Sequence, residues 1–140
     1  MANTLYDEAR KLFLEGQIDW LGDTIKAMLI DRDAYTPNFS AHKNMSDIPG
    51  TTPGTGARVT GGVVLTNKAT TGGAADADDV TFTAVSGPSV ESVLLYRQGS
   101  DDSDSTLIAW LDTATGLPIT PNGGDIIVTW DNGVNRIFRL

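Results

Sequence analysis

After one helical segment, the chain consists of short apolar runs separated by turn residues, and this pattern limits the possible folds more than any other feature. Threonine, glycine, valine and aspartate dominate, whereas glutamate occurs three times and lysine four times. Such a composition favours strands and turns over helices. Seven or eight short strands at this spacing predict a mainly β fold, an antiparallel β-sandwich or barrel. A jelly roll is its most natural eight-stranded form, and an immunoglobulin-like strand order is the alternative. The expected strands are 23–31, 57–67, 80–85, 90–98, 106–112, 125–130 and 135–140, with an eighth around 68–72.

Two of these runs carry further information. In 80–85, Val80, Phe82 and Ala84 alternate with Thr81 and Thr83, which predicts one buried face. The run 106–112 is apolar at successive positions, which predicts a central strand buried on both faces. The turn sequence 131–133, Asp-Asn-Gly, lies between the last two runs and predicts a hairpin that joins them.

The N-terminal segment 1–16 is predicted to be a short helix. We expect Asn3 or Thr4 to cap its start and Gly16 to end it. The apolar residues that recur at the spacing of one helix face are Leu5, Ala9, Leu12 and Phe13.

The segment 40–56 differs from the rest because it is rich in proline, glycine, serine and threonine. We expect a long loop that contributes nothing to the core and is either a contact arm or a mobile connection. The length of 140 residues fits one domain, so residues 1–140 are predicted to form a single β-sandwich domain with this loop attached.

Composition excludes several classes of function. The formal net charge is −8, which argues against binding to nucleic acid or to an anionic membrane. Without cysteine there can be no disulfide, thiol catalysis or cysteine-ligated metal, and a single histidine, His42, rules out multi-histidine sites. No secretion signal or membrane-spanning stretch is recognisable, so we expect the chain to be made in a cytosol.

No catalytic constellation stands out. A Ser–His–Asp triad would have to use His42, which we interpret as an exposed loop histidine. The glycine-rich stretch 50–56 lacks the lysine and following helix of a phosphate loop. The aspartates of 76–79 and 101–104 are expected in solvated turns, where nothing raises a pKa as a glycosidase requires. We therefore expect no enzymatic activity and no catalytic residue.

Calcium is the more plausible use of such aspartates, but Thr106 and Leu107 break the EF-hand spacing that would start at Asp102. We expect no metal site and no cofactor. The stretch 76–112 holds seven aspartates and one glutamate against one arginine, a net charge of −7, which suggests a single charged edge that faces water or a basic partner. Trp20, Trp110 and Trp130 are expected in the core or at a subunit interface rather than on a sugar-binding surface.

Several stretches together resemble a family of small virion proteins of tailed bacteriophages. The opening LYDEARKLFLEGQIDWLGDTIKAMLID has the family's short helix ending in glycine, followed by a strand of the form W-x-x-D-T-I-K-x-x-L-x-D. The remaining resemblance lies in the segments DADDVTF, YRQGSDDSDSTLIA and GGDIIVTW and in the closing IF. It covers roughly residues 5–35 and 75–140 and is weakest at 40–56.

This resemblance implies a virion structural protein without enzymatic activity. Its most concrete form is a head decoration, or cement, protein that binds the major capsid protein on the outer capsid surface, with assembly in the bacterial cytoplasm. Self-association as a dimer or trimer on the shell is a further expectation. The helix 1–16 or the loop 40–56 would supply the contact. A tail-associated fibre, baseplate or receptor-binding module that uses the turns near 99–105 or 116–124 is the alternative, and a carbohydrate-binding module is a third.

Overall fold

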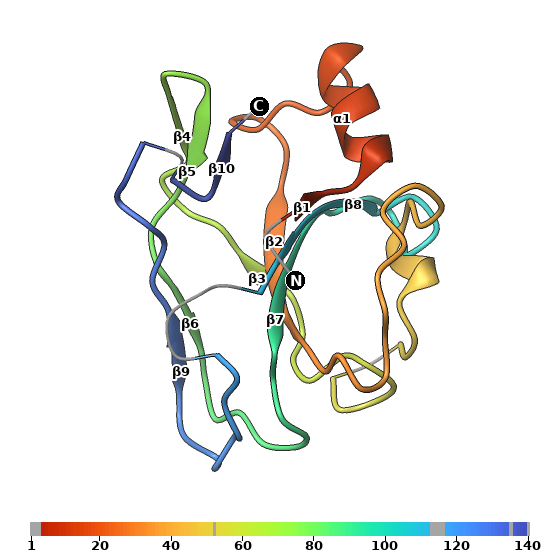
Figure 1. The fold of residues 1–140 in the computed structure, drawn as a ribbon, viewed down its shortest axis with the longest axis vertical. Coiled ribbons are helices and arrows are strands. Elements are labelled where there is room, and N and C mark those ends of the chain that lie inside the picture. Colours follow the sequence, from red (N-terminus) through yellow and green to blue (C-terminus); the bar gives the residue numbers. More distant parts are fainter. Residues whose placement is uncertain (1–3, 52, 113–116, 135, 140) are drawn as a thin grey trace.

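A computed structural model describes residues 4–51, 53–112, 117–134 and 136–139. They form a mainly β, sandwich-like structure with three antiparallel sheets and one α-helix (Figure 1). The elements are β1 (Thr4–Leu5), α1 (Asp7–Leu14), β2 (Ile25–Ile30), the 3-10 helix η1 (Met45–Asp47), β3 (Val63–Val64), β4 (Ala69–Thr71), β5 (Ala74–Asp76), β6 (Val80–Phe82), β7 (Ser92–Arg97), β8 (Thr106–Leu111), β9 (Ile126–Val128) and β10 (Phe138–Arg139).

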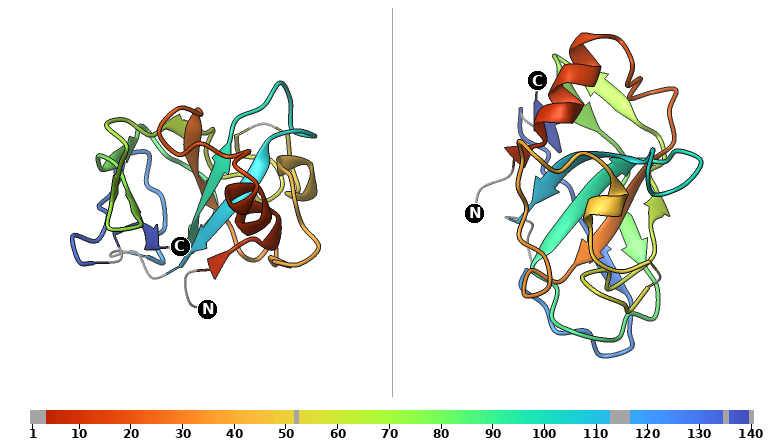
Figure 2. Two further views of the ribbon diagram at one scale, coloured as in Figure 1. Left: turned by 90° about the horizontal axis from the view of Figure 1, so that it is seen from above. Right: turned by 90° about the vertical axis from the view of Figure 1, so that its right-hand side faces the viewer.

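The largest sheet has the strand order β1-β8-β7-β2-β3 and forms the middle layer of the molecule. Its long strands are apolar at successive positions, so both faces bury side chains. The predicted central strand, β8, is buried along its whole length and lies between β1 and β7. Figure 2 shows the two smaller sheets on one side of this layer and the coil around η1 on the other.

Each side of the middle layer therefore has its own core. Toward the small sheets, Leu29 and Leu95 pack with Val80 and Phe82 of β6. The predicted alternation holds at these two residues and is wrong at Ala84, which is exposed and has a φ of 50°, so that the strand ends at Phe82. On the opposite face, Met28, Leu94 and Trp110 form a second core together with the side chains of the 35–57 segment. The sandwich thus includes a third layer that consists mostly of coil.

The expected hairpin at 131–133 is wrong. The turn itself forms, because the Asp131 carboxylate accepts the Gly133 N–H at 3.0 Å. However, β9 pairs with β6, whereas β10 pairs with β5, so the chain passes here from one small sheet to another. The alternating apolar residues of β9 find their partners in β6, which lies more than forty residues earlier in the chain.

The N-terminal helix is shorter than the predicted 1–16. It begins at Asp7, because Thr4 and Leu5 pair with β8 and extend the main sheet. Thr4 is thus a strand residue, the N-cap is Tyr6, and Asn3 lies outside the described residues. The predicted end is confirmed: Gly16 has a φ of 71°, the left-handed conformation that ends a helix and that glycine adopts without strain.

The predicted strand 57–67 is regular only in β3. Its first half still follows β2, because Ile30 forms an isolated bridge with Arg58 and the Val59 N–H donates to the Leu29 carbonyl. The Thr60 hydroxyl then accepts the Leu29 N–H at 3.1 Å, so a side chain takes the place of a backbone acceptor in the ladder.

The expectation that 40–56 contributes nothing to the core is wrong. Met45 and Ile48 are 1% and 2% exposed and belong to the second core. The Arg58 guanidinium, itself buried, donates to the carbonyl oxygens of Met45 at 2.7 Å and Ile48 at 3.3 Å and forms an ion pair with Asp102 at 3.0 Å. Residues 45–48 are therefore packed into the fold rather than part of a free arm.

Candidate functional site

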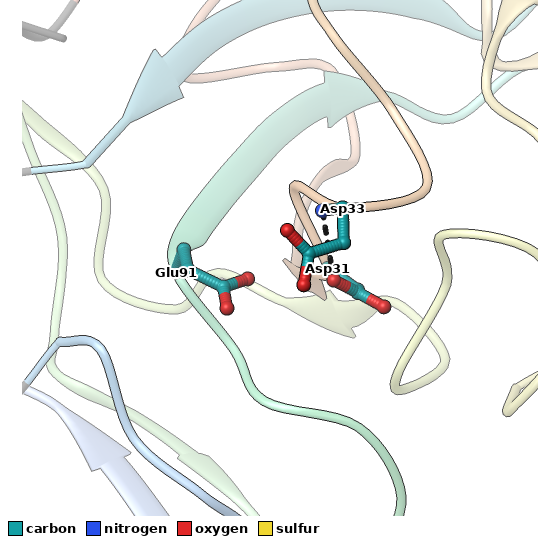
Figure 3. A group of neighbouring side chains, drawn as sticks. All are labelled: Asp31, Asp33 and Glu91. Atoms are coloured by element: carbon teal, nitrogen blue, oxygen red, sulfur yellow. Dashed lines mark hydrogen bonds between the residues drawn. The ribbon is translucent and has the colours of Figure 1, made fainter.

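Three carboxylates meet where β2 ends and β7 begins (Figure 3). Ile30 lies opposite Ser92 in the antiparallel pair, so Asp31 and Glu91 leave the sheet at the same end. Asp33 follows two residues after Asp31, and one carboxylate oxygen of each residue lies within 4.8 Å of the others. Among the described residues, this is the one group of three acids close enough to hold a metal ion.

The acidic trio already has a structural role. The Asp33 N–H donates to Asp31 Oδ1 at 2.9 Å, and the Arg32 N–H donates to Glu91 Oε2 at 3.0 Å. These bonds close the turn after β2 and tie it to the start of β7. Carboxylate oxygens are suitable ligands for a hard cation such as calcium, but the backbone hydrogen bonds account for the arrangement without one. Sequence reasoning missed the trio because Glu91 is far from Asp31 in the chain.

The aspartates of 101–104 close the β7–β8 turn, as expected. Asp104 accepts the Asp101 N–H at 2.9 Å and the Ser100 hydroxyl at 2.7 Å, and these hydrogen bonds hold its pKa at about 2. Asp101 accepts the Ser103 N–H at 2.8 Å. With Asp102 paired to Arg58, the cluster acts as a set of turn and ion-pair acceptors.

The aspartates of 76–79 support the small sheets. The Trp20 indole donates to the Asp76 carbonyl at 3.2 Å, and the Trp130 indole donates to the Asp78 carbonyl at 2.9 Å. The Asp79 carboxylate accepts the Trp130 N–H at 3.0 Å. This segment lies beside β5 and β6, on the other side of the molecule from the β7–β8 turn (Figure 1). The acidic stretch of the sequence therefore does not form the single charged edge that we expected.

All three tryptophans are buried, with Trp110 at 0% exposure, as expected for core residues. His42 differs from the prediction, because it is half-buried and hydrogen-bonded rather than an exposed loop residue. The Asn38 N–H donates to His42 Nδ1 at 3.1 Å, so this nitrogen is an acceptor. It follows that the Tyr35 hydroxyl, 2.8 Å away, donates to it, and that Tyr6 donates to Tyr35 at 3.0 Å. The partners of His42 are thus a tyrosine and a backbone amide, not a serine nucleophile.

Three exposed apolar side chains, Leu14, Leu21 and Val134, lie on segments that adjoin α1 and β10, and we call this region the α1–β10 end. Leu14 is the last residue of α1 and is 89% exposed, and Leu21 lies in the coil that follows. Val134 is 79% exposed, and its carbonyl accepts a bond from the guanidinium of Arg139 in β10. The end of α1, the coil that leads to β2, and β10 lie together at the top of Figure 1.

Aromatic contacts hold this end together. The Phe138 ring of β10 lies 6.1 Å from the Phe13 ring and 5.3 Å from the Trp20 ring, measured between centroids. Phe13 and Trp20 are the chain neighbours of Leu14 and Leu21. These ring contacts, between the buried Trp20 and the half-buried Phe13 and Phe138, connect the segments that carry the exposed leucines to β10. Helical periodicity places Leu12 and Phe13, but not Leu14, on the packed face of the helix, and the structure agrees.

Comparison with known proteins finds no family model that matches the chain and no curated protein similar to it. In the part of the chain that the structure describes, no helix has the length and apolar character required for a membrane span.

Proposed function

We propose that the chain is a non-enzymatic virion structural protein of a tailed bacteriophage, and that it decorates the capsid by binding the major capsid protein on the outer surface. The resemblance of residues 5–35 and 75–140 to such virion proteins supports this proposal. So does the use of the polar side chains, because the aspartates and His42 serve as hydrogen-bond acceptors that hold turns together.

The observation that carries the proposal is the α1–β10 end. Among the described residues, five large apolar side chains are exposed, and three of them are Leu14, Leu21 and Val134. A surface region that exposes several large apolar side chains is a candidate for protein binding. Many copies on one shell add avidity, so each contact needs only modest affinity.

This surface replaces the loop 40–56 as the preferred contact. Deletion of 40–56 would remove Met45 and Ile48 from the second core and the carbonyl partners of Arg58. A loss of binding after such a deletion would therefore report unfolding as much as a lost contact. Substitutions at exposed positions give a cleaner test.

The test is co-sedimentation of the purified chain with expanded capsid shells of the phage that encodes it. We expect Leu14→Ser and Val134→Ser each to weaken binding by about ten- to a hundredfold, because burial of a leucine or valine stabilises a contact by roughly 1.5–3 kcal/mol. Ile127→Ser is the matched control, since Ile127 is 63% exposed but lies on β9. Equal effects of all three substitutions, or no binding by the unsubstituted chain, would contradict the proposal.

A further inference from the structure

A hollow of about 360 Å³ lies beside the α1–β10 end, and two arginines line it. We propose that this hollow, lined by Thr71, Gly72, Asn132, Gly133, Val134, Arg136 and Arg139, binds a carboxylate side chain of a protein partner. The inference rests on the proposed function and specifies the chemistry of the partner: a docking segment that presents aspartate or glutamate next to an apolar residue.

The hollow is built from three chain segments that the sheet brings together. The turn between β4 and β5 consists of Gly72 and Gly73, whose φ values of 60° and 83° suit a two-residue hairpin of the type that needs glycine at both positions. Strand β10 pairs with β5, and Arg139 lies opposite Ala74, directly beside this turn. The 131–133 turn supplies the remaining wall.

The arginines are placed to receive an anion. None of the residues that line the hollow is acidic. Nη1 of Arg139 donates to the Val134 carbonyl at 3.3 Å, and Nη1 of Arg136 lies 3.6 Å from the Asp76 carboxylate. A guanidinium carries five N–H donors in a planar fork, so these contacts at Nη1 leave further donors for a ligand. Arg136 also has a φ of 48°, a strained conformation for a residue with a side chain.

A carboxylate on a peptide suits this hollow better than a polyanion does. The chain carries a net charge of −8, which repels nucleic acid and other extended anions. A volume near 360 Å³ lies at the lower end of the range for ligand pockets, enough for one side chain and its neighbours. The exposed Val134 at the rim offers an apolar contact beside the charge.

The test is an NMR titration of the full chain with the blocked tripeptide Leu-Glu-Leu, with Leu-Gln-Leu as the neutral control peptide and inorganic phosphate in a third arm. We expect the glutamate peptide to shift the Arg139 Nε–H and Gly72 N–H signals and to bind about tenfold more tightly than the glutamine peptide, as one charge-assisted hydrogen bond would provide. Arg139→Gln should abolish the difference between the peptides, and Arg139→Lys should restore it in part because lysine keeps the charge without the fork.

Arg10→Gln is the matched control, since Arg10 is an exposed arginine on α1 that pairs only locally with Asp7. Equal shifts from both peptides, or shifts unchanged by Arg139→Gln, would overturn the inference. Tighter binding of phosphate than of the glutamate peptide would overturn it in favour of a phosphate site. Co-sedimentation of the unsubstituted chain with shells, compared with its peptide titration, separates the two proposals. Peptide binding without shell binding refutes the proposed function alone, whereas shell binding without peptide binding refutes the carboxylate site alone.

Discussion

Tyr6, Tyr35 and His42 form a hydrogen-bonded row that joins the start of the chain to the coil of the third layer. Tyr6 is 0% exposed and Tyr35 5%. The Phe39 ring packs edge-on against Tyr6 with a centroid distance of 5.1 Å, and Tyr35 contacts Trp110. The direct partners of His42, Tyr35 and Asn38, lie within seven residues of it, but Tyr6, the N-cap of α1, joins the row from a distant part of the chain. A histidine among prolines and glycines predicts exposure, and the tertiary contacts decide otherwise.

Burial raises the pKa of Tyr35 to about 12, and burial also raises the pKa of Tyr6. Both groups release their protons more readily in the unfolded chain, where a tyrosine has a pKa near 10. Their stabilising contribution is therefore complete below about pH 10 and is lost as the pH rises toward about 12. We expect the free energy of unfolding to fall by about 2–3 kcal/mol over this range from Tyr35 alone.

Urea denaturation measured between about pH 9 and about pH 12 tests this, because the pKa of an unfolded tyrosine, near 10, and the pKa of Tyr35, about 12, set the range. Tyr35→Phe should flatten the alkaline fall, although it also removes a hydrogen bond and so lowers stability at neutral pH. The same slope in Tyr35→Phe and in the unsubstituted chain would show that Tyr35 is not the titrating group.

The elements differ in how well the sequence anticipates them. Strands with a strong alternating or continuous apolar pattern, such as β2, β6, β7 and β8, lie where the residues predict them. The partners of β9 and β10 could not be predicted, because pairing depends on residues far away in the chain rather than on the turn between the two strands. Strand β1 has only two residues, and Leu5 also fits the helical spacing of the residues that follow. The sequence pattern therefore assigns both residues to the helix.

The 40–56 segment illustrates the same limit. Met45 and Ile48 are two apolar residues in a stretch otherwise typical of a linker. They are core residues only because the fold packs them with Leu107 and Trp110 of β8. Because Met45 is 1% exposed, we expect Met45→Ala to lower the free energy of unfolding by about 2–5 kcal/mol, the usual range for such a deletion in a core.

Chemical denaturation monitored by tryptophan fluorescence measures this effect, with Ser46→Ala as the control, since Ser46 is the exposed neighbour of Met45. The control should change stability by less than about 0.5 kcal/mol, as surface substitutions usually do. If Met45→Ala is as mild as Ser46→Ala, the segment is not part of the core.

In the whole molecule, the acidic side chains and the exposed apolar side chains are grouped differently from their order along the chain. Six of the eight acidic residues of 76–112 divide between the β5–β6 region and the β7–β8 turn, on opposite sides of the main sheet (Figure 1), while Glu91 precedes β7 and Asp112 follows β8. The exposed leucines and Val134 come from opposite ends of the chain, and the Phe13–Phe138 and Trp20–Phe138 ring contacts bring the adjoining segments, α1 with its following coil and β10, together. Composition indicates a chain with few reactive groups, but only the fold brings together a surface that could bind a partner.

The central claim is that this chain sits on the capsid. Negative-stain microscopy of intact virions, labelled with gold-conjugated antibody raised against the purified chain, tests it directly. We expect label at many positions over the head, and the label should disappear from particles that lack the gene. Label confined to the tail or its tip would contradict the claim and support a tail-associated protein, and particles without label would contradict a virion role altogether.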